Sequence, residues 1–340
     1  MDIKKYFIKR ITLSIFVLLG LSIVIFFISR VVPGDPARLA LGDRASQEAV
    51  DALRAEMRLD EPLPKQYVAW LGGVIQGDFG KSLTTKRPVI EDIKQFLPAT
   101  LELGFFGAIM MVILSISLGT FAARYKNKWP DTLIRAGAYI GVAIPSFVLA
   151  TLLILLFGYY WRVIPVLGRI SPSYDIETVT GFMLIDCAIA RNFKAMWDAF
   201  LHLLCPAFAL ACGGMFQEAR IIRNAMVDNS NKDFLMAHKG YGIPNNIVFK
   251  KYLLKPSLIP AISVLGLDVA QMFGGSFLVE MIFVWPGLAR YGTTCLLSKD
   301  LNSISAVVLI TGTIITVINI IVDLIVAYLD PRIRLGGKTK

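Results

Sequence analysis

Acidic residues interrupt the long apolar runs of this sequence, and four of them suggest chemistry by their type and position. They are Glu102, Asp268, Glu280 and Asp323. An ionisable side chain in a bilayer usually faces a partner or a water-filled path, because its burial in hydrocarbon is costly. These residues are therefore the first candidates for lining a route through a membrane.

Asp268 is the strongest of these candidates because it lies near the middle of its apolar run. Gly266, Gly274 and Gly275 surround it. Glycines let helices approach closely or flex, which is useful in a gate, although simple helix packing explains them equally well. We predict that Asp268, Gly274 and Gly275 line a translocation pathway.

The other three acids and two prolines carry separate expectations. Glu102 and Glu280 lie near the outer ends of their runs, where a pathway role and a carboxylate reaching toward the membrane surface are equally good explanations. Asp323 is expected to satisfy a helix–helix contact. Pro145 and Pro206 are expected to kink their helices, and Pro145 joins the pathway candidates.

Catalytic, metal and nucleotide sites receive little support from the sequence. His202 and His238 fall on opposite sides of the proposed membrane, which argues against a Ser-His-Asp centre. The segment 77–82 has glycines near a Lys and a Ser but lacks the spacing of a phosphate-binding loop, so an external turn is expected. The four cysteines have no metal-ligand spacing, and two of them are expected to pack in a helix. The cysteines are Cys187, Cys205, Cys212 and Cys295. We expect no catalytic residue, metal or cofactor in this chain.

The composition predicts an all-α, polytopic membrane protein. Of 340 residues, 55% are hydrophobic and 18% are charged. The apolar residues gather in six blocks, each long enough as a helix to cross a hydrocarbon core of about 30 Å. The blocks are 11–29, 101–123, 134–161, 199–219, 258–282 and 303–329.

The basic residues predict the orientation of these helices. Lys and Arg gather at 4–10, 124–128, 220–255 and 332–340. With six spans these segments share one side, which the positive-inside rule assigns to the cytoplasm together with both termini. The net charge of +10 is then mostly topological, and nucleic acid is not an expected partner.

Two connections between the apolar blocks are expected to be folded. The first outer loop contains residues 47–59, whose apolar spacing fits a short amphipathic helix. The basic segment 228–260 carries a short helical stretch ended by Gly240 to Gly242, then a second helix with Pro244 in its first turn. An amphipathic connection lying on the headgroups remains the alternative for this segment.

The segment 228–260 resembles the cytoplasmic loop of binding-protein-dependent ABC importer permeases, in which a short helix docks into the ATPase. The family pattern E-A-A-x-x-x-G is matched here by Ala237 and Gly242 only, with Met236 and His238 beside the alanine. Fifteen residues separate Gly242 from 258–260, Leu-Ile-Pro, as in the peptide and nickel branch. The resemblance implies that Met236 and Ala237 pack into the ATPase cleft and that Gly242 allows the close turn. It further implies rim contacts from Asp233, His238 and Lys239.

Blocks along nearly the whole chain are similar to the dipeptide/oligopeptide/nickel permease family. The blocks are 32–36, VPGDP; 77–82, GDFGKS; 87–89, RPV; 96–103, FLPATLEL; 179–186, VTGFMLID; 282–287, IFVWPG; and the ending 319–334. This resemblance implies the type I ABC importer permease architecture in a bacterial inner membrane. It also implies four kinds of partner: a second homologous permease, two ABC ATPases that use ATP and Mg, an external solute-binding protein and the lipid bilayer.

These inferences combine into one predicted division of the chain. It comprises a cytoplasmic N-terminus at 1–10, spans at 11–31, 99–123, 133–161, 199–219, 258–282 and 303–329, outer loops at 32–98, 162–198 and 283–302, cytoplasmic loops at 124–132 and 220–257 (the coupling loop), and a cytoplasmic tail at 330–340. The core permease domain is expected at about 95–335.

Small peptides are the favoured substrate, with a nickel or other metal chelate as the alternative. The outer insertion at about 168–198 looks more like dipeptide permeases, whereas 87–103 is equally similar to nickel permeases. An ion-coupled secondary transporter is the alternative from another class. It would need internal repeats, and the two halves show no convincing one.

Overall fold

The computed structural model describes residues 3–31, 36–42, 45–56 and 58–329. Within these ranges the regular elements are helices, with one isolated bridge between Lys81 and Pro88. Five helices are long and apolar enough to cross a membrane. These membrane-crossing stretches coincide with or overlap five helices: α1 (Ile3–Val31), α5 (Val89–Arg124), α9 (Phe193–Ser230), α12 (Lys255–Gly275) and α15 (Leu301–Leu329). The predicted all-α membrane fold is confirmed.

A sixth apolar segment is broken in two at Pro145. Helix α6 (Trp129–Ala143) and the pair α7 (Ser146–Leu153) with the following π-helix (Ile154–Tyr160) meet at 105°. Proline lacks a backbone N–H and forces the preceding residue into extended backbone. Ile144, at φ −85° and ψ 118°, obeys this rule. The expected kink is thus a full break, whereas helix α9 continues through Pro206.

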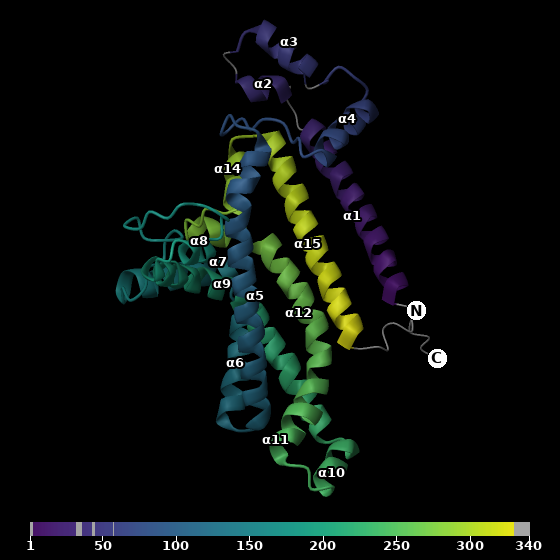
Figure 1. Ribbon diagram of the computed structural model, residues 1–340, viewed down its shortest axis with the longest axis vertical. Coiled ribbons are helices and arrows are strands. Elements are labelled where there is room, and N and C mark those ends of the chain that lie inside the picture. Colours follow the sequence, from purple (N-terminus) through teal and green to yellow (C-terminus); the bar gives the residue numbers. More distant parts are fainter. Residues whose placement is uncertain (1–2, 32–35, 43–44, 57, 330–340) are drawn as a thin grey trace.

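The helices form an elongated bundle whose two ends carry different sets of short helices (Figure 1). Helices α1 and α15 lie side by side on one flank, and α5, α9 and α12 pack against one another beside them. One end, here called the α14 end, carries α2 (Pro36–Leu41), α3 (Gln47–Glu56), α4 (Leu63–Ile75) and α14 (Leu288–Leu297). The opposite end, the α10 end, carries α10 (Asp233–Gly240) and α11 (Asn245–Ile247). The α8 helix (Met183–Ile189) and α13 (Phe277–Ile282) complete the helices, with a second π-helix at Val248–Leu254.

The helices extend past the predicted spans. Helix α5 begins at Val89 and α9 at Phe193, ahead of the predicted starts at 99 and 199. Polar residues continue a helix wherever water or protein satisfies its surface, so hydropathy marks only the apolar part. The spans and loops of the predicted division therefore stay predictions, and 32–35 and 330–340 lie outside the described residues.

The first predicted outer loop is folded. The amphipathic helix expected from Gln47 is present as α3, and a further helix that was not expected, α4, packs on α1. Phe26 of α1 contacts the rings of Tyr67 and Trp70 at centroid distances of 5.3 and 5.5 Å. Ser22 and the Tyr67 hydroxyl are 2.8 Å apart. Aromatic packing and one hydrogen bond thus fix the loop to the first helix.

A buried polar network explains the glycine-rich segment 77–82. Ser82 Oγ donates to Asp300 Oδ2 at 2.6 Å, and the backbone N–H of Leu83 donates to the same oxygen at 2.7 Å. The Tyr291 hydroxyl lies 2.9 Å from Asp92 Oδ2 and 2.8 Å from Ser303 Oγ. The segment is a turn, as expected. Its hydrogen bonds belong to a network that links α5, α14 and α15.

Helix α15 is held on both sides by close contacts. Asp323 accepts a hydrogen bond from Arg10 of α1 at 3.0 Å, which confirms its predicted helix–helix contact. On the other side, Gly266 of α12 leaves room for Val322, whose side chain occupies the space that a Cβ at 266 would need. Small residues at such crossings are the usual way for membrane helices to pack closely.

We expect Gly266→Ala to destabilise the bundle by about 1–3 kcal/mol, because the new methyl group overlaps Val322 in a packed interface. Thermal unfolding in detergent measures the effect. Gly20→Ala is the matched control, since nothing lies within 4 Å of a Cβ at that position in α1. Equal melting temperatures for the two variants would contradict the packing role of Gly266.

Candidate functional site

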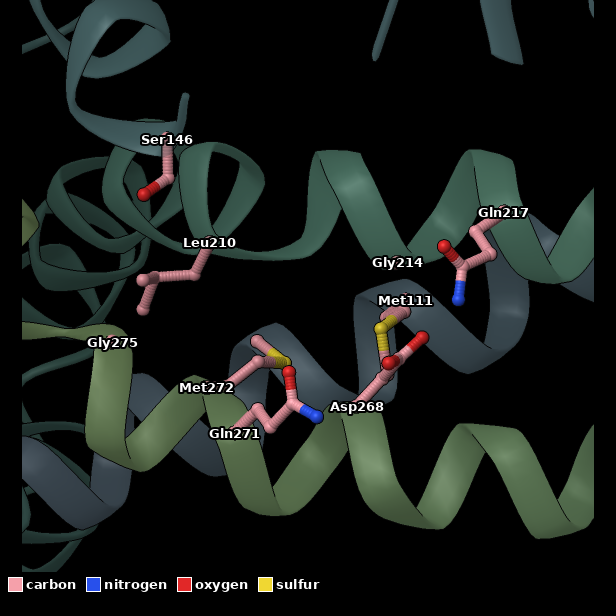
Figure 2. A pocket seen from close by; sticks show the side chains of 9 residues that line it. All are labelled: Met111, Ser146, Leu210, Gly214, Gln217, Asp268, Gln271, Met272 and Gly275. Atoms are coloured by element: carbon pink, nitrogen blue, oxygen red, sulfur yellow. The ribbon is translucent and has the colours of Figure 1, made fainter. Parts of the chain in front are cut away.

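A cavity of about 210 Å³ lies between α5, α7, α9 and α12 (Figure 2). Polar side chains of Gln217, Asp268 and Gln271 face it from two helices, and Met111 and Met272 supply apolar surface. The lining is completed by Ser146, Leu210, Gly214 and Gly275. Ser146 is the first residue after the Pro145 break, so the break sets one wall of the cavity.

Asp268, the strongest pathway candidate from the sequence, lines this cavity together with Gly275. A Cβ at Gly214 would lie 3.3 Å from Asp268 Oδ2, so the missing side chain lets the carboxylate approach α9. Apart from the Glu218 carboxyl group, Asp268 Oδ2 has no hydrogen-bond partner among the described residues. Gly274, in contrast, faces α15, where a Cβ would lie 3.5 Å from Ile315.

Glu218 is a second carboxylate at this place, and the sequence analysis did not find it. It follows Gly214 by one helical turn, is fully buried, and interacts electrostatically with Asp268. Apart from the Asp268 carboxyl group, neither of its oxygens has a hydrogen-bond partner among the described residues. The only sequence signal is an acid at the last positions of the apolar run 199–219.

Glu102 is absent from the cavity lining and ties α5 to the segment before α8. Arg169 forms an ion pair with Glu102, and the backbone N–H of Leu184 donates to its other oxygen at 2.9 Å. Arg169 also donates to the carbonyl of Gly181 at 2.7 Å. These contacts join two of the family-like blocks, 96–103 and 179–186.

Glu280 also lies outside the lining and joins α13 to α5 and α14. It accepts hydrogen bonds from Thr100 Oγ1 at 2.7 Å and from the backbone N–H of Arg290 at 3.0 Å. Trp285 Nε1 donates to the carbonyl of Ala99 at 2.9 Å. The block 282–287 therefore packs on the block 96–103.

Asp186 closes a turn at the start of α8, outside the apolar helices. Burial alone would raise its pKa, but hydrogen bonds from the Thr180 hydroxyl and from the backbone N–H groups of Thr180 and Gly181 outweigh burial and hold the pKa below its usual value. Hydrogen bonds to a carboxylate favour its charged form. The carboxylate therefore keeps this loop folded at neutral pH.

Helix α10 has one anchored face and one exposed face. Leu235 is buried in a cluster with Ile222 and Met226 of α9 and Val248, Leu253 and Ala261. Phe234 and Met236 are 40% and 59% exposed, and Asp233 and Ala237 are exposed as well. The His238 ring packs on Tyr252 at a centroid distance of 3.9 Å. The side chain of Lys239 lies outside the described residues.

The predicted glycine stop is present after α10. Gly242 has φ +73°, a left-handed conformation that L side chains rarely adopt. Pro244 is the N-cap of α11, one position before the first turn in which it was expected. The first predicted short helix and the glycine turn are present, whereas the second helix is the three-residue α11, which continues through the π-helix Val248–Leu254 into α12.

Two family descriptions match nearly the whole chain. Residues 115–335 match the family described as binding-protein-dependent transport system inner membrane component, and residues 3–104 match its N-terminal counterpart. The chain belongs to this family. It is thus a multi-pass inner-membrane component of a transport system that works with a solute-binding protein and an ATPase.

Several curated proteins are similar to this permease over almost their full length. A probable D,D-dipeptide transport system permease of Escherichia coli K12 is 36% identical over 324 residues, which are 95% of each chain. A dipeptide transport system permease of Alkalihalophilus pseudofirmus is 35% identical, covering 97% of this chain and 99% of that one. An oligopeptide transport system permease of Bacillus subtilis is 34% identical with the same coverage.

An ion pair connects α9 of the permease to α6. Arg223 donates to Asp131 through Nε at 3.0 Å and through Nη2 at 2.6 Å, and the backbone N–H of Asn127 donates at 2.9 Å. Asp131 is fully buried. Such a bidentate pair fixes both the distance and the angle between the two groups. The start of α6 is therefore fixed to the last part of α9, near the α10 end.

We expect Arg223→Gln to destabilise the protein by up to roughly 3–5 kcal/mol, because it removes the bidentate partner of the buried Asp131 carboxylate and leaves the more distant Arg135 at 3.6 Å. The double variant Arg223→Gln with Asp131→Asn removes both charges and is expected to recover most of that loss. Chemical or thermal unfolding in detergent compares the two. A double variant no more stable than the single one would refute a direct pairing.

Proposed function

We propose that this chain is the membrane-spanning subunit of an ATP-driven importer and forms half of the pathway for small peptides delivered by a solute-binding protein. The carrying observation is the family match over 115–335 together with a polar cavity between the central helices of that region. The relatives described above are named as dipeptide or oligopeptide permeases, which supports peptides as the substrate.

The cavity chemistry supports the same substrate class. Side-chain amides of Gln217 and Gln271 can donate to and accept from a peptide bond. The side chains of Met111 and Met272 are flexible and polarisable, which suits a surface that must accept varied side chains. Neither a metal chelate nor ion-coupled transport receives support from the family or from these relatives.

The coupling step is assigned to α10. Met236 and Ala237 are exposed and would enter a cleft of the ATPase. Asp233, His238 and Lys239 would contact its rim. ATP and Mg would be bound and hydrolysed by the ATPase, with no catalytic group, metal or cofactor in this chain. The α10 end would then be cytoplasmic, as would both termini.

The assembly we propose contains this permease, a second homologous permease, two ATPases and the external solute-binding protein. Closure of the ATPases would move α10 as a rigid body. Because α10 packs on α9 through Leu235 and α9 lines the cavity, the same displacement would reach the cavity wall. The Arg223–Asp131 pair would carry α6 along, and with it the Pro145 break.

Uptake into proteoliposomes containing the four membrane-bound subunits tests the function. With the solute-binding protein and a labelled dipeptide outside, we expect accumulation that requires ATP on the ATPase side. A metal chelate is expected to give none. Uptake driven by an ion gradient without ATP would overturn the proposal.

Gly242 tests the coupling assignment. A β-branched residue with positive φ is strained by roughly 1–2 kcal/mol, so Gly242→Val is expected to shift α10 and to lower ATP-driven peptide uptake about tenfold or more. Nothing lies within 4 Å of a Cβ at this position, which isolates the backbone effect. Gly242→Asn is the matched control, because Asn tolerates this conformation. Equal uptake by the two variants would rule out a turn-dependent coupling helix.

A further inference from the structure

The carboxylates of this chain follow one rule with one exception. Seven acidic residues are buried in the described ranges: Asp92, Glu102, Asp131, Asp186, Glu218, Glu280 and Asp300. Six of them accept hydrogen bonds from side chains, backbone N–H groups or arginines. Glu218 is the exception, since the carboxyl group of Asp268 is its one partner and no N–H group, hydroxyl or arginine among the described residues donates to it.

The exception lies beside the cavity. Its carboxyl group contacts that of Asp268, which faces the cavity. Among the described residues, the ion pairs of the structure involve neither carboxylate. Buried charges are normally paired, so two adjacent carboxylates in apolar helices form a place that attracts a cation.

The rest of the cavity narrows the choice of cation. Gln217 and Gln271 can bond to amide groups, and Met111, Met272 and Leu210 present apolar surface. A hydrated ion would bond to the amide groups only and would leave the apolar surface unused. A small peptide uses all of them, because it carries an ammonium group, amide groups and side chains of varied size.

We propose that Asp268, which faces the cavity, and Glu218, which is buried behind it, form the subsite that receives the ammonium group at the amino end of a transported peptide. This inference rests on the proposed peptide-import function. The carboxylates offer acceptors for the N–H donors of the ammonium group, and a charge-assisted hydrogen bond is about twice as strong as a neutral one. Gly214 lets Asp268 take its place beside α9.

The subsite is tested by protection of a thiol in the cavity. The complete transporter carrying Ser146→Cys is labelled with a small thiol reagent, and the wild-type protein reports background from the native cysteines, which are all buried. The probes are alanine methylamide, which carries the ammonium group, and N-acetylalanine methylamide, which does not. Both are used without the binding protein, so its own selectivity does not enter.

We expect saturating alanine methylamide to slow labelling of the introduced thiol about fivefold, in proportion to the occupied fraction of sites. N-acetylalanine methylamide is expected to have little effect. Adding Glu218→Gln and Asp268→Asn together is expected to remove the protection. Glu177→Gln replaces one carboxyl group at an exposed position, as each single variant does at the subsite, and is the control that keeps the protection. Each single variant is measured as well, so that the test survives a double variant that fails to fold.

Four results would overturn the subsite: equal slowing by both probes, slowing by sodium ions alone, unchanged protection in the double variant, or no slowing by any probe. Uptake of labelled peptide by the wild-type transporter is measured on the same preparation. Intact uptake with failed protection rejects the subsite alone, whereas absent uptake rejects the proposed peptide function.

Discussion

The cost of burying charge among apolar helices organises this molecule. At the α14 end, Glu102, Glu280 and Asp300 are each buried and each fully engaged with hydrogen-bond donors. These bonds fasten loops that are far apart in sequence onto α5, α14 and α15. Near the α10 end, Arg223 does the same for Asp131. Compensated charges therefore mark the rigid parts, and the uncompensated pair Glu218 and Asp268 marks the part that meets a ligand.

Helix α9 connects these parts. It begins at Phe193 near α8, continues through Pro206, presents Leu210, Gly214 and Gln217 to the cavity, and ends at Ser230 shortly before α10. Because α9 remains one helix despite the backbone hydrogen bond that Pro206 cannot donate, a displacement of α10 would be transmitted along its length. The Pro145 break gives α7 an angle of 105° to α6, so that a side wall of the cavity can be moved separately from the long helices. The continuous helix α9 beside the broken pair α6 and α7 suits a pathway that opens and closes.

The sequence predicted what local patterns determine. Apolar block length predicted the membrane helices, Pro145 predicted a kink where the structure has a full break, and Gly242 predicted the turn after α10. Asp268 was identified because it stands alone in an apolar run. Glu218 was missed because it lies beside Gln217 and Arg220, where an acid looks ordinary, and only the packing of α5, α9 and α12 buries it. The partner of Glu102 is Arg169, 67 residues away, and no spacing rule reaches that far. Helix α4 was missed because a helix that does not span the membrane need not have the length of a bilayer crossing, so block length did not reveal it.

The central claim is that the acidic pair beside the cavity meets the amino end of the substrate. A structure of the complete transporter, trapped with a peptide in transit, measures this directly through the distance from the peptide nitrogen to the two carboxylates. The account predicts a separation of about 3 Å from Glu218 or Asp268. A peptide whose carboxyl end or side chain occupies this place, or which passes on another face of α9, would contradict it.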